Sequence, residues 1–296
     1  MVQTVAYFDL FDFPLTYPEL YRYLWRAPQT SLSEVITTAT QLPSLVSTGG
    51  FVMFAKREGL ATTRQSRYIE SELKWNKRRW FIQWLSYLPG VQAIFLVNTL
   101  AYHNVQSDSD IDLLIVAQPK KIWAVRFYTT LLAKLFGVRP KPGRTKDAVC
   151  LSFYATPTGL TQLAQLRSSD DDVLEAYWLA QALPLYDPHH YAAQLIHNPW
   201  IKTVLPNTVP QTTHFNRQIH VTWLHQVMQA FGQLWLWNSL LKQLQLWFMP
   251  ARLKQLSGPL ETAVVVLSND VMKFHTYDPR PQLMQRWRER VENYSR

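Results

Sequence analysis

The middle of the chain alternates between strand-like and helix-like patterns of apolar residues. Residues 93–97 (AIFLV) and 111–116 (IDLLIV) are short runs that are apolar on both faces, which is typical of central strands covered by helices. Residues 120–136 have the spacing of an amphipathic helix, and residues 148–155 (AVCLSFYA) predict a third strand. This order predicts an α/β (α+β) domain with a small mixed sheet over residues 91–168.

The first 62 residues predict helices followed by a hairpin. Two Ser/Thr-x-x-Glu patterns have the form of a capping box, in which the hydroxyl and the carboxylate each satisfy a free backbone N–H. These pairs are Thr16 with Glu19 and Ser31 with Glu34. Two apolar runs around Gly49-Gly50 then predict a β-hairpin. We expect a winged-helix-like module over residues 1–62, joined by a basic helix over residues 63–90.

Residues 169–296 predict a mainly helical C-terminal region that is interrupted by prolines. A short β-branched run at 263–267 precedes a last basic helix. The most apolar stretch, residues 230–248, contains several Gln, Asn and Lys residues, so it predicts an amphipathic helix rather than a membrane span. We therefore expect no membrane partner.

Composition narrows the class of protein. A hydrophobic fraction of 47% and a charged fraction of 17% are typical of a globular chain. The single cysteine, Cys150, excludes an internal disulfide framework and a cysteine-based zinc site. The N-terminus has no basic leader, so we expect a cytoplasmic location. The net charge of +9 makes nucleotides, RNA or DNA plausible partners.

The basic connecting helix is a candidate nucleic-acid surface. Its four clustered cations, which surround Trp75 and Trp80, are Lys74, Lys77, Arg78 and Arg79. Cations interleaved with aromatic rings can hold single-stranded nucleic acid by charge and stacking. The same pattern also fits a solvated helix face with both tryptophans turned inward. Both interpretations remain open at this point.

A DNA-reading role for the N-terminal module is less favoured. In a winged helix the third helix usually enters the major groove. Here that helix, within residues 31–42, has Glu34 as its single charged residue and no Lys or Arg. It would lack the phosphate contacts that supply most of the affinity for DNA. Packing or binding a partner is the more probable role on this pattern.

The candidate chemistry lies at Asp110 and Asp112, at the start of an apolar run. Residues two apart in a strand point to the same face, so both carboxylates can bind the same divalent cations. Two metal ions bound in this way are a common solution for displacement at phosphorus. The sequence Ser-Asp-Ser-Asp is also good turn chemistry, however, and could be purely local.

The whole stretch from residue 95 to 116 resembles the signature of the nucleotidyltransferase superfamily related to DNA polymerase beta. That signature has an apolar strand, Gly-Ser, about ten residues, and then Ser-Asp-Ile-Asp with a second apolar strand. Here Asn98-Thr99 stands for Gly-Ser, and Ser109 precedes the acidic pair. The resemblance implies that Asp110 and Asp112 are catalytic metal ligands for Mg²⁺ or Mn²⁺. It implies nucleotide-binding roles for Asn98, Thr99 and Ser109.

Other segments are similar to a group of uncharacterised bacterial nucleotidyltransferase-domain proteins. These segments are YFDLFDFPLT, CLSFYAT, YWLAQALPLYD and VLPN. Two departures from the superfamily pattern stand out. Asn98 replaces the glycine, although Asn tolerates a left-handed backbone better than most residues. The strand at 148–155 contains no third carboxylate, which leaves Asp147 at its beginning as the candidate.

The sequence thus predicts a nucleotidyltransferase-like protein. The expected reaction is Mg²⁺-dependent transfer of a nucleoside monophosphate from an NTP to a hydroxyl of RNA, protein or a small molecule. A degenerate member that binds nucleotide or nucleic acid without catalysis is the main alternative, because the glycine and the third acid are missing. A winged-helix regulator is the third.

Overall fold

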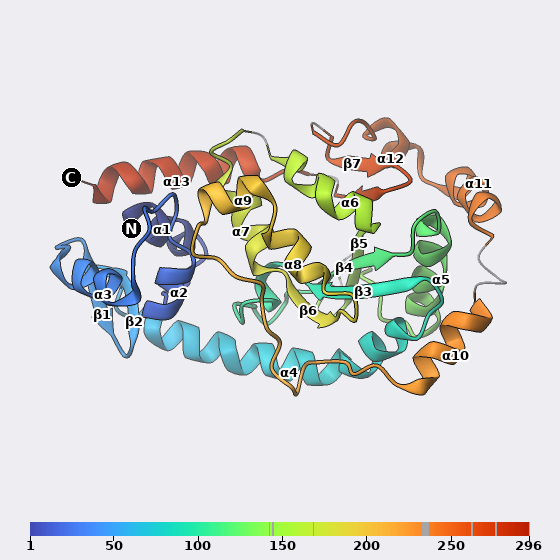
Figure 1. Ribbon diagram of the computed structural model, residues 1–296, viewed down its shortest axis with the longest axis horizontal. Coiled ribbons are helices and arrows are strands. Elements are labelled where there is room, and N and C mark those ends of the chain that lie inside the picture. Colours follow the sequence, from blue (N-terminus) through green and yellow to red (C-terminus); the bar gives the residue numbers. More distant parts are fainter. Residues whose placement is uncertain are drawn as a thin grey trace.

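A six-stranded mixed sheet forms the centre of the molecule (Figure 1). The fold is that of a computed structural model, which describes residues 1–141, 143, 145–167, 169–232, 237–261, 263–275 and 277–295. The strand order is β6-β3-β4-β5-β8-β7. The strands are β3 (Val91–Leu96), β4 (Ile111–Ala117), β5 (Val149–Ala155), β6 (Leu183–Tyr186), β7 (Val265–Leu267) and β8 (Val271–Phe274). Of these neighbours, β4 and β5 run parallel and the other pairs are antiparallel.

The predicted strands of the central domain are confirmed as β3, β4 and β5, and the predicted helix between the last two is α5 (Ile122–Leu135). The sequence analysis missed β6 and β8, which come from the region expected to be mainly helical. β6 reads LPLY and directly follows a helix, so its four residues look like the end of that helix. It lies at the edge of the sheet, where a proline such as Pro184 is tolerated.

The two faces of the sheet bury different cores, because alternate residues of a strand point to opposite sides. Leu114 and Val116 of β4 belong to a cluster with Phe8 and Tyr177. Ile115 of β4 belongs to the other cluster, on the opposite face. The first face is covered by α1 (Val2–Asp9), α7 (Val173–Gln181) and α13 (Arg280–Tyr294), and the second by α4 (Leu60–Ser86) and α5.

The N-terminal segment has the predicted order of three helices and a hairpin. After α1 come α2 (Tyr17–Arg22), α3 (Leu32–Gln41), β1 (Leu45–Thr48) and β2 (Phe51–Phe54). Both predicted capping boxes are formed, at the starts of α2 and α3. Gly49 and Gly50 have φ of 59° and 84°, as a two-residue hairpin turn with two left-handed positions requires. The local predictions for this segment are therefore confirmed.

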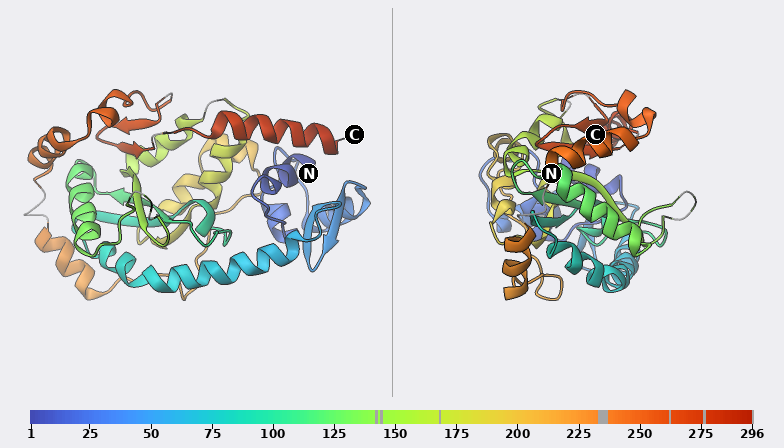
Figure 2. Two further views of the ribbon diagram at one scale, coloured as in Figure 1. Left: turned by 180° about the vertical axis from the view of Figure 1, so that it is seen from behind. Right: turned by 90° about the vertical axis from the view of Figure 1, so that its right-hand side faces the viewer.

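The two ends of the chain pack on each other. Helix α13 runs beside α1, and the long helix α4 lies on the opposite side of the molecule (Figures 1 and 2). Asp9 of α1 is buried and pairs with Arg57 and with Arg290 of α13, at 3.0 and 2.7 Å. The ring of Phe54 stacks on Tyr294 with centroids 3.7 Å apart. The N-terminal module thus shares its core with the C-terminus.

The remaining segments are short helices that cover the sheet and its ends. They are α6 (Pro157–Gln162), α8 (Tyr191–Ile196), α9 (Pro199–Val204), α10 (Trp223–Gly232), α11 (Asn238–Phe248), α12 (Ala251–Gln255) and the 3₁₀ helices η1 (Asn98–Leu100) and η2 (Leu163–Leu166). The apolar stretch predicted as one helix over 230–248 contains the end of α10 and all of α11, and residues 233–236 lie outside the described residues. No helix in the described part of the chain is both long and apolar enough to cross a membrane.

One glycine allows the β7–β8 hairpin to dock on α6. A Cβ atom on Gly159 would lie 2.0 Å from the carbonyl oxygen of Asp270, a backbone atom that also accepts a hydrogen bond from Thr156 N. We expect Gly159→Ala to lower the free energy of unfolding by about 1–3 kcal/mol, because the hairpin must move away. Urea denaturation measures this change.

The matched control is Gly59→Ala, at the start of α4, where an added Cβ meets no atom within 4 Å. We expect this control to stay within about 0.5 kcal/mol of the parent. Equal effects of the two substitutions would contradict the packing described for Gly159.

Candidate functional site

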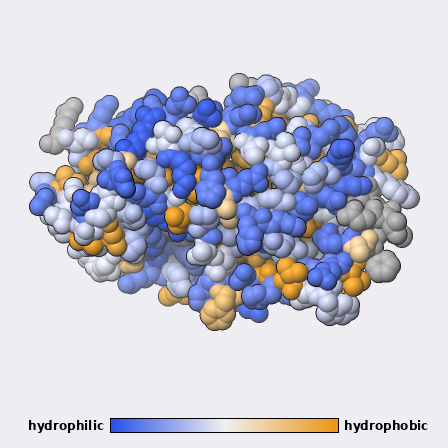
Figure 3. Space-filling model, in the orientation of Figure 1, coloured by the Kyte–Doolittle hydropathy of each residue, from blue (hydrophilic) through white to orange (hydrophobic). Residues whose placement is uncertain are grey.

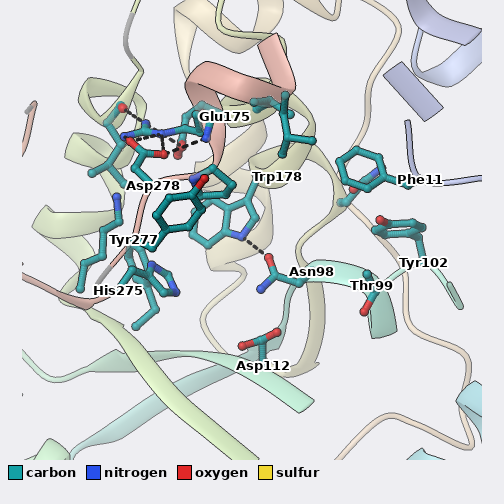
Figure 4. A pocket seen from close by; sticks show the side chains of 18 of the residues that line it. Phe11, Asn98, Thr99, Tyr102, Asp112, Glu175, Trp178, His275, Tyr277 and Asp278 are labelled. Carbon is teal, nitrogen blue, oxygen red and sulfur yellow. Dashed lines mark hydrogen bonds and ion pairs between the residues drawn. The ribbon is translucent and has the colours of Figure 1, made fainter. Parts of the chain in front are cut away.

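A cavity of about 590 Å³ lies where one end of the sheet meets α7, α13 and α1 (Figure 4). All five residues that the sequence assigned to metal or nucleotide line this cavity. They are Asn98, Thr99, Ser109, Asp110 and Asp112. The end of β3 and the start of β4 meet here because the two strands are antiparallel, with Val97 N donating to Asp112 O at 3.1 Å.

The acidic pair is joined by a residue that the sequence analysis did not place there. One carboxylate oxygen each of Asp110 and Asp112 and the thiol sulfur of Cys150 lie within 4.8 Å of one another. Cys150 reaches this position because it is the parallel-register partner of Asp112 in β5. It stands beside the acidic pair on the strand in which the superfamily pattern led us to look for a third acid.

Burial and mutual repulsion shape the electrostatics of this cluster. Burial raises the pKa of Asp110. Burial and then the neighbouring charge of Asp110 raise the pKa of Asp112 to about 6. Burial and the charge of Asp112 raise the pKa of the Cys150 thiol to about 12, so this group stays protonated at neutral pH. A divalent cation would relieve the repulsion between the two carboxylates.

Asn98 connects the part of the cavity that contains the acidic pair to helix α7. Its φ of 58° is left-handed, a conformation that Asn accepts more readily than most residues. Its side-chain oxygen accepts a hydrogen bond from Trp178 Nε1 at 3.0 Å (Figure 4). Its side chain also acts on Asp112 and opposes the rise in the pKa of that carboxyl. The amide therefore links the acidic pair to α7.

The basic cluster of α4 holds the loops behind the acidic pair. Lys74 is buried, and its ammonium donates to the carbonyl oxygens of Ser107 and Ser109 and to Asp147 Oδ1, at 2.9, 3.0 and 2.9 Å. Lys77 donates to Asp147 Oδ2 at 2.5 Å, and Arg78 Nε donates to the carbonyl oxygen of Asp147 at 2.7 Å. Three of the four cations thus have protein partners.

The remaining members of that cluster differ in exposure. Arg79 is exposed, Trp75 is buried, and Trp80 is exposed rather than turned inward. A nucleic-acid role for this helix stays a prediction.

Asp147, the candidate third carboxylate, lies in this ion-pair cluster and not beside Asp110 and Asp112. Burial opposes its ionisation, but the hydrogen bonds and charges of Lys77 and Lys74 lower its pKa overall. It is absent from the residues that line the cavity. The structure therefore does not bring Asp147 together with the acidic pair.

The opposite wall of the cavity carries charges that the sequence analysis missed. Lys273 of β8 is 8% exposed, and its ammonium makes no hydrogen bond or salt bridge to any residue that the structure describes. Burial, and then the charge of Arg280, lower its pKa. Arg280, at the start of α13, pairs with Asp278 at 2.8 Å. The sequence feature that could have pointed to Lys273 is the position of this lysine inside the short apolar run VMKF.

Glu175 of α7 lies beside these cations. Burial and the charge of Asp172 raise the pKa of Glu175 to about 8, and its Oε2 lies 3.8 Å from Arg280. Aromatic rings also line the cavity, among them Phe11, Tyr102 and Trp178. Flat rings of this kind can stack on a planar ligand group.

Comparisons with known proteins give no further guide to the site. A scan against protein-family models found no match, and searches of the curated proteins and of the solved structures found none either. The resemblance to the nucleotidyltransferase superfamily stays a prediction that rests on the motif and segments quoted above.

The raised pKa of Asp112 predicts a stability effect in metal-free protein. A carboxyl whose pKa is higher in the folded chain contributes stability below its unfolded pKa, and this contribution is lost as the pH rises through about 6. We expect Asp112→Asn in EDTA to be more stable than the parent at neutral pH, by on the order of 1–2 kcal/mol. We expect its stability to vary less between about pH 4 and 6.

Urea denaturation across this pH range measures the effect. Asp108→Asn is the control, because Asp108 is exposed on the same loop and should leave the stability unchanged. A parent more stable than Asp112→Asn at neutral pH would contradict the account of the buried pair.

The position of Asp147 predicts a structural role. We expect Asp147→Ala to lower the free energy of unfolding by about 3–5 kcal/mol, because it removes the anion that lies 2.9 Å from the buried ammonium of Lys74 and leaves only Glu70, at 3.9 Å. We expect Mn²⁺ affinity, followed by the paramagnetic relaxation of water, to stay unchanged. A third-carboxylate role requires the reverse, with weakened Mn²⁺ binding. Asp170→Ala, which removes an exposed partner of Arg167, is the control for stability.

Proposed function

We propose that the cavity binds a nucleoside triphosphate with a divalent cation and that the chain transfers a nucleoside monophosphate to a hydroxyl acceptor. One observation carries the proposal. Two carboxylates lie at one end of a cavity whose opposite wall carries Lys273, which is nearly buried and makes no hydrogen bond or salt bridge to a described residue, and Arg280. A ligand that satisfies both ends must bring anionic groups and must also accommodate a metal between itself and the carboxylates.

The size and lining of the cavity support a nucleotide. Its volume of about 590 Å³ lies within the range of small-molecule sites. Aromatic side chains such as Trp178 and Tyr102 offer faces for a base. Lys273 and Arg280 offer positive charge for phosphate oxygens. The base and the phosphates of an NTP thus each have side chains of suitable chemistry in the cavity.

The donor set fits Mg²⁺ or Mn²⁺. Asp110 and Asp112 supply hard carboxylate oxygens, and Mg²⁺ is often held by one or two carboxylates with water and phosphate completing its shell. The protonated thiol of Cys150 is a soft group that Mg²⁺ does not favour. When bound, the metal would neutralise phosphate charge. The role of Asn98 is to stabilise the ionised form of Asp112, which is the form that binds a cation.

A catalytically degenerate nucleotide-binding protein is the second candidate. The observation that favours it is the position of Cys150, a thiol that stands beside Asp112 where we looked for a third acid. Without a third acid beside the pair to accept its proton, the acceptor hydroxyl would attack slowly. The two candidates share a binding site and differ in turnover. The regulator hypothesis for the N-terminal module stays a prediction.

The experiment combines binding and transfer. We expect an NTP with Mg²⁺ or Mn²⁺ to raise the melting temperature, because a ligand bound only by the folded state stabilises it. The double variant Asp110→Asn with Asp112→Asn should abolish this rise. Lys273→Met should weaken NTP binding about tenfold or more, because a charge-assisted hydrogen bond is lost. Lys254→Met, an exposed lysine on α12, is the matched control.

Transfer is followed with each labelled NTP and a mixed RNA pool. Label that reaches RNA or the protein supports the enzyme, and binding without transfer supports the degenerate protein. Melting temperatures unchanged by all four NTPs with both metals would refute both.

A further inference from the structure

Helix α11 presents its most hydrophobic side to solvent. Leu240, Leu244, Trp247 and Phe248 follow the spacing of one helix face, and all four are exposed. Trp247 is 76% exposed and Phe248 is 71% exposed. An ordinary surface helix of a globular protein turns such a face toward the core. This face therefore has no partner among the residues that the structure describes.

Both hydrogen bonds and apolar contacts attach α11 to the rest of the molecule. Gln245 Nε2 donates to the carbonyl oxygen of Trp123 at 2.8 Å, and Asn238 Oδ1 accepts from Trp123 N at 3.0 Å. Leu241 is the buried residue on this inner side. The hydrogen bonds with α5 fix the orientation of α11, and this orientation points the aromatic face outward.

Helix α10 adds exposed hydrophobic residues at the same end of the molecule. Trp223 is 73% exposed, and Val227 and Met228 are also exposed. Figure 1 places α5, α10 and α11 together at the end away from the N-terminal module, and Figure 3 shows hydrophobic residues on the surface there. We call the exposed side chains of α10 and α11 the apolar end face.

This end of the molecule is also depleted of acidic residues. The sequence has no Asp or Glu between Asp187 and Glu261, a stretch that contains α10, α11 and α12. It has none between Asp112 and Asp147 either, a stretch that contains α5. Arg252 and Lys254 of α12 are exposed directly after the apolar end face. The combination is a hydrophobic and aromatic surface within a positively charged region.

We propose that the apolar end face docks on the surface of an anionic lipid bilayer without spanning it, which revises the expectation of no membrane partner. Exposed Trp, Phe and Leu on one side of a short helix, with cations nearby and few anions, match the chemistry of the headgroup boundary. Helix α11 has 11 residues and would lie in the plane of the surface. The negative charge of the lipids complements the positive charge around the apolar end face. Each exposed cation near the bilayer surface strengthens the attraction.

Charge and side-chain type favour this occupant over two others. A second copy of the chain would bring one acid-free, cationic end against another, so like charges would repel. Single-stranded RNA would match the cations and stack on tryptophans, but it offers no apolar surface for Leu240, Leu244 and Val227.

The test is co-sedimentation of the full chain with vesicles. We expect binding to phosphatidylcholine vesicles that contain phosphatidylglycerol, and much weaker binding to vesicles of phosphatidylcholine alone. The variant Leu244→Glu with Trp247→Glu should lower the partition coefficient about tenfold or more, because two apolar side chains no longer insert. Added salt should weaken binding by the parent.

The control variant is Ile69→Glu with Leu73→Glu, which changes two exposed apolar residues on α4. It should bind vesicles like the parent, and both variants should keep the melting temperature of the parent, since all four side chains are exposed. Failure to bind anionic vesicles would overturn the proposal. So would equal loss in both variants, displacement by RNA, or a parent dimer that Leu244→Glu with Trp247→Glu converts to monomer.

The test is independent of the nucleotide site. NTP binding can be measured on the same variants, and its success or failure does not bear on the vesicle result.

Discussion

The repulsion between two carboxylates in a partly buried cavity is the constraint around which the central part of this molecule is organised. Asp110 and Asp112 project from the start of one strand, so the period of the strand alone brings them together. Separate contacts keep them in place against their repulsion. The Asn98 side chain stabilises the charged form of one of them, and Lys74 binds the backbone of Ser109 directly before the other. Buried like charges of this kind are retained where a ligand compensates them.

The cavity depends on segments from both ends of the chain. Its floor comes from β3 and β4, whereas its opposite wall comes from α7, β8 and the start of α13. Helix α13 is held by the ion pair between Asp9 and Arg290 and by the hydrogen bond from Trp287 Nε1 to the carbonyl oxygen of Gln3. The N-terminal module therefore supports the wall of the cavity by packing, whatever else it binds.

The basic residues of this protein divide into groups with different physical roles. Lys74 is buried, and its ammonium donates hydrogen bonds to three protein oxygens, so its charge stabilises the loops that carry them. Lys273 is buried at the wall of the cavity, where it makes no hydrogen bond or salt bridge to a described residue and feels the charges of Glu175 and Asp278. Arg252 and Lys254 are exposed in an acid-free region, where they act through the field they create at the surface. A net charge of +9 by itself cannot separate these roles.

The sequence by itself determined the features that depend on neighbours along the chain. The capping boxes at Thr16 and Ser31, the turn at Gly49-Gly50 and the strands around the acidic pair follow from local backbone chemistry and from the period of apolar residues. The common orientation of Asp110 and Asp112 follows from the same period. These features need no knowledge of distant segments.

The tertiary structure decided which distant residues complete the site. Cys150 stands beside Asp112 because of the parallel register of β4 and β5, and Asp147 is held away by cations about seventy residues earlier in the chain. Lys273 reaches the cavity because a strand far along the chain joins the sheet next to β5. The strands that supply this wall are short, and their pairing is fixed by side chains across the sheet. Because strand pairing and burial are set by long-range packing, local sequence patterns carry no record of them.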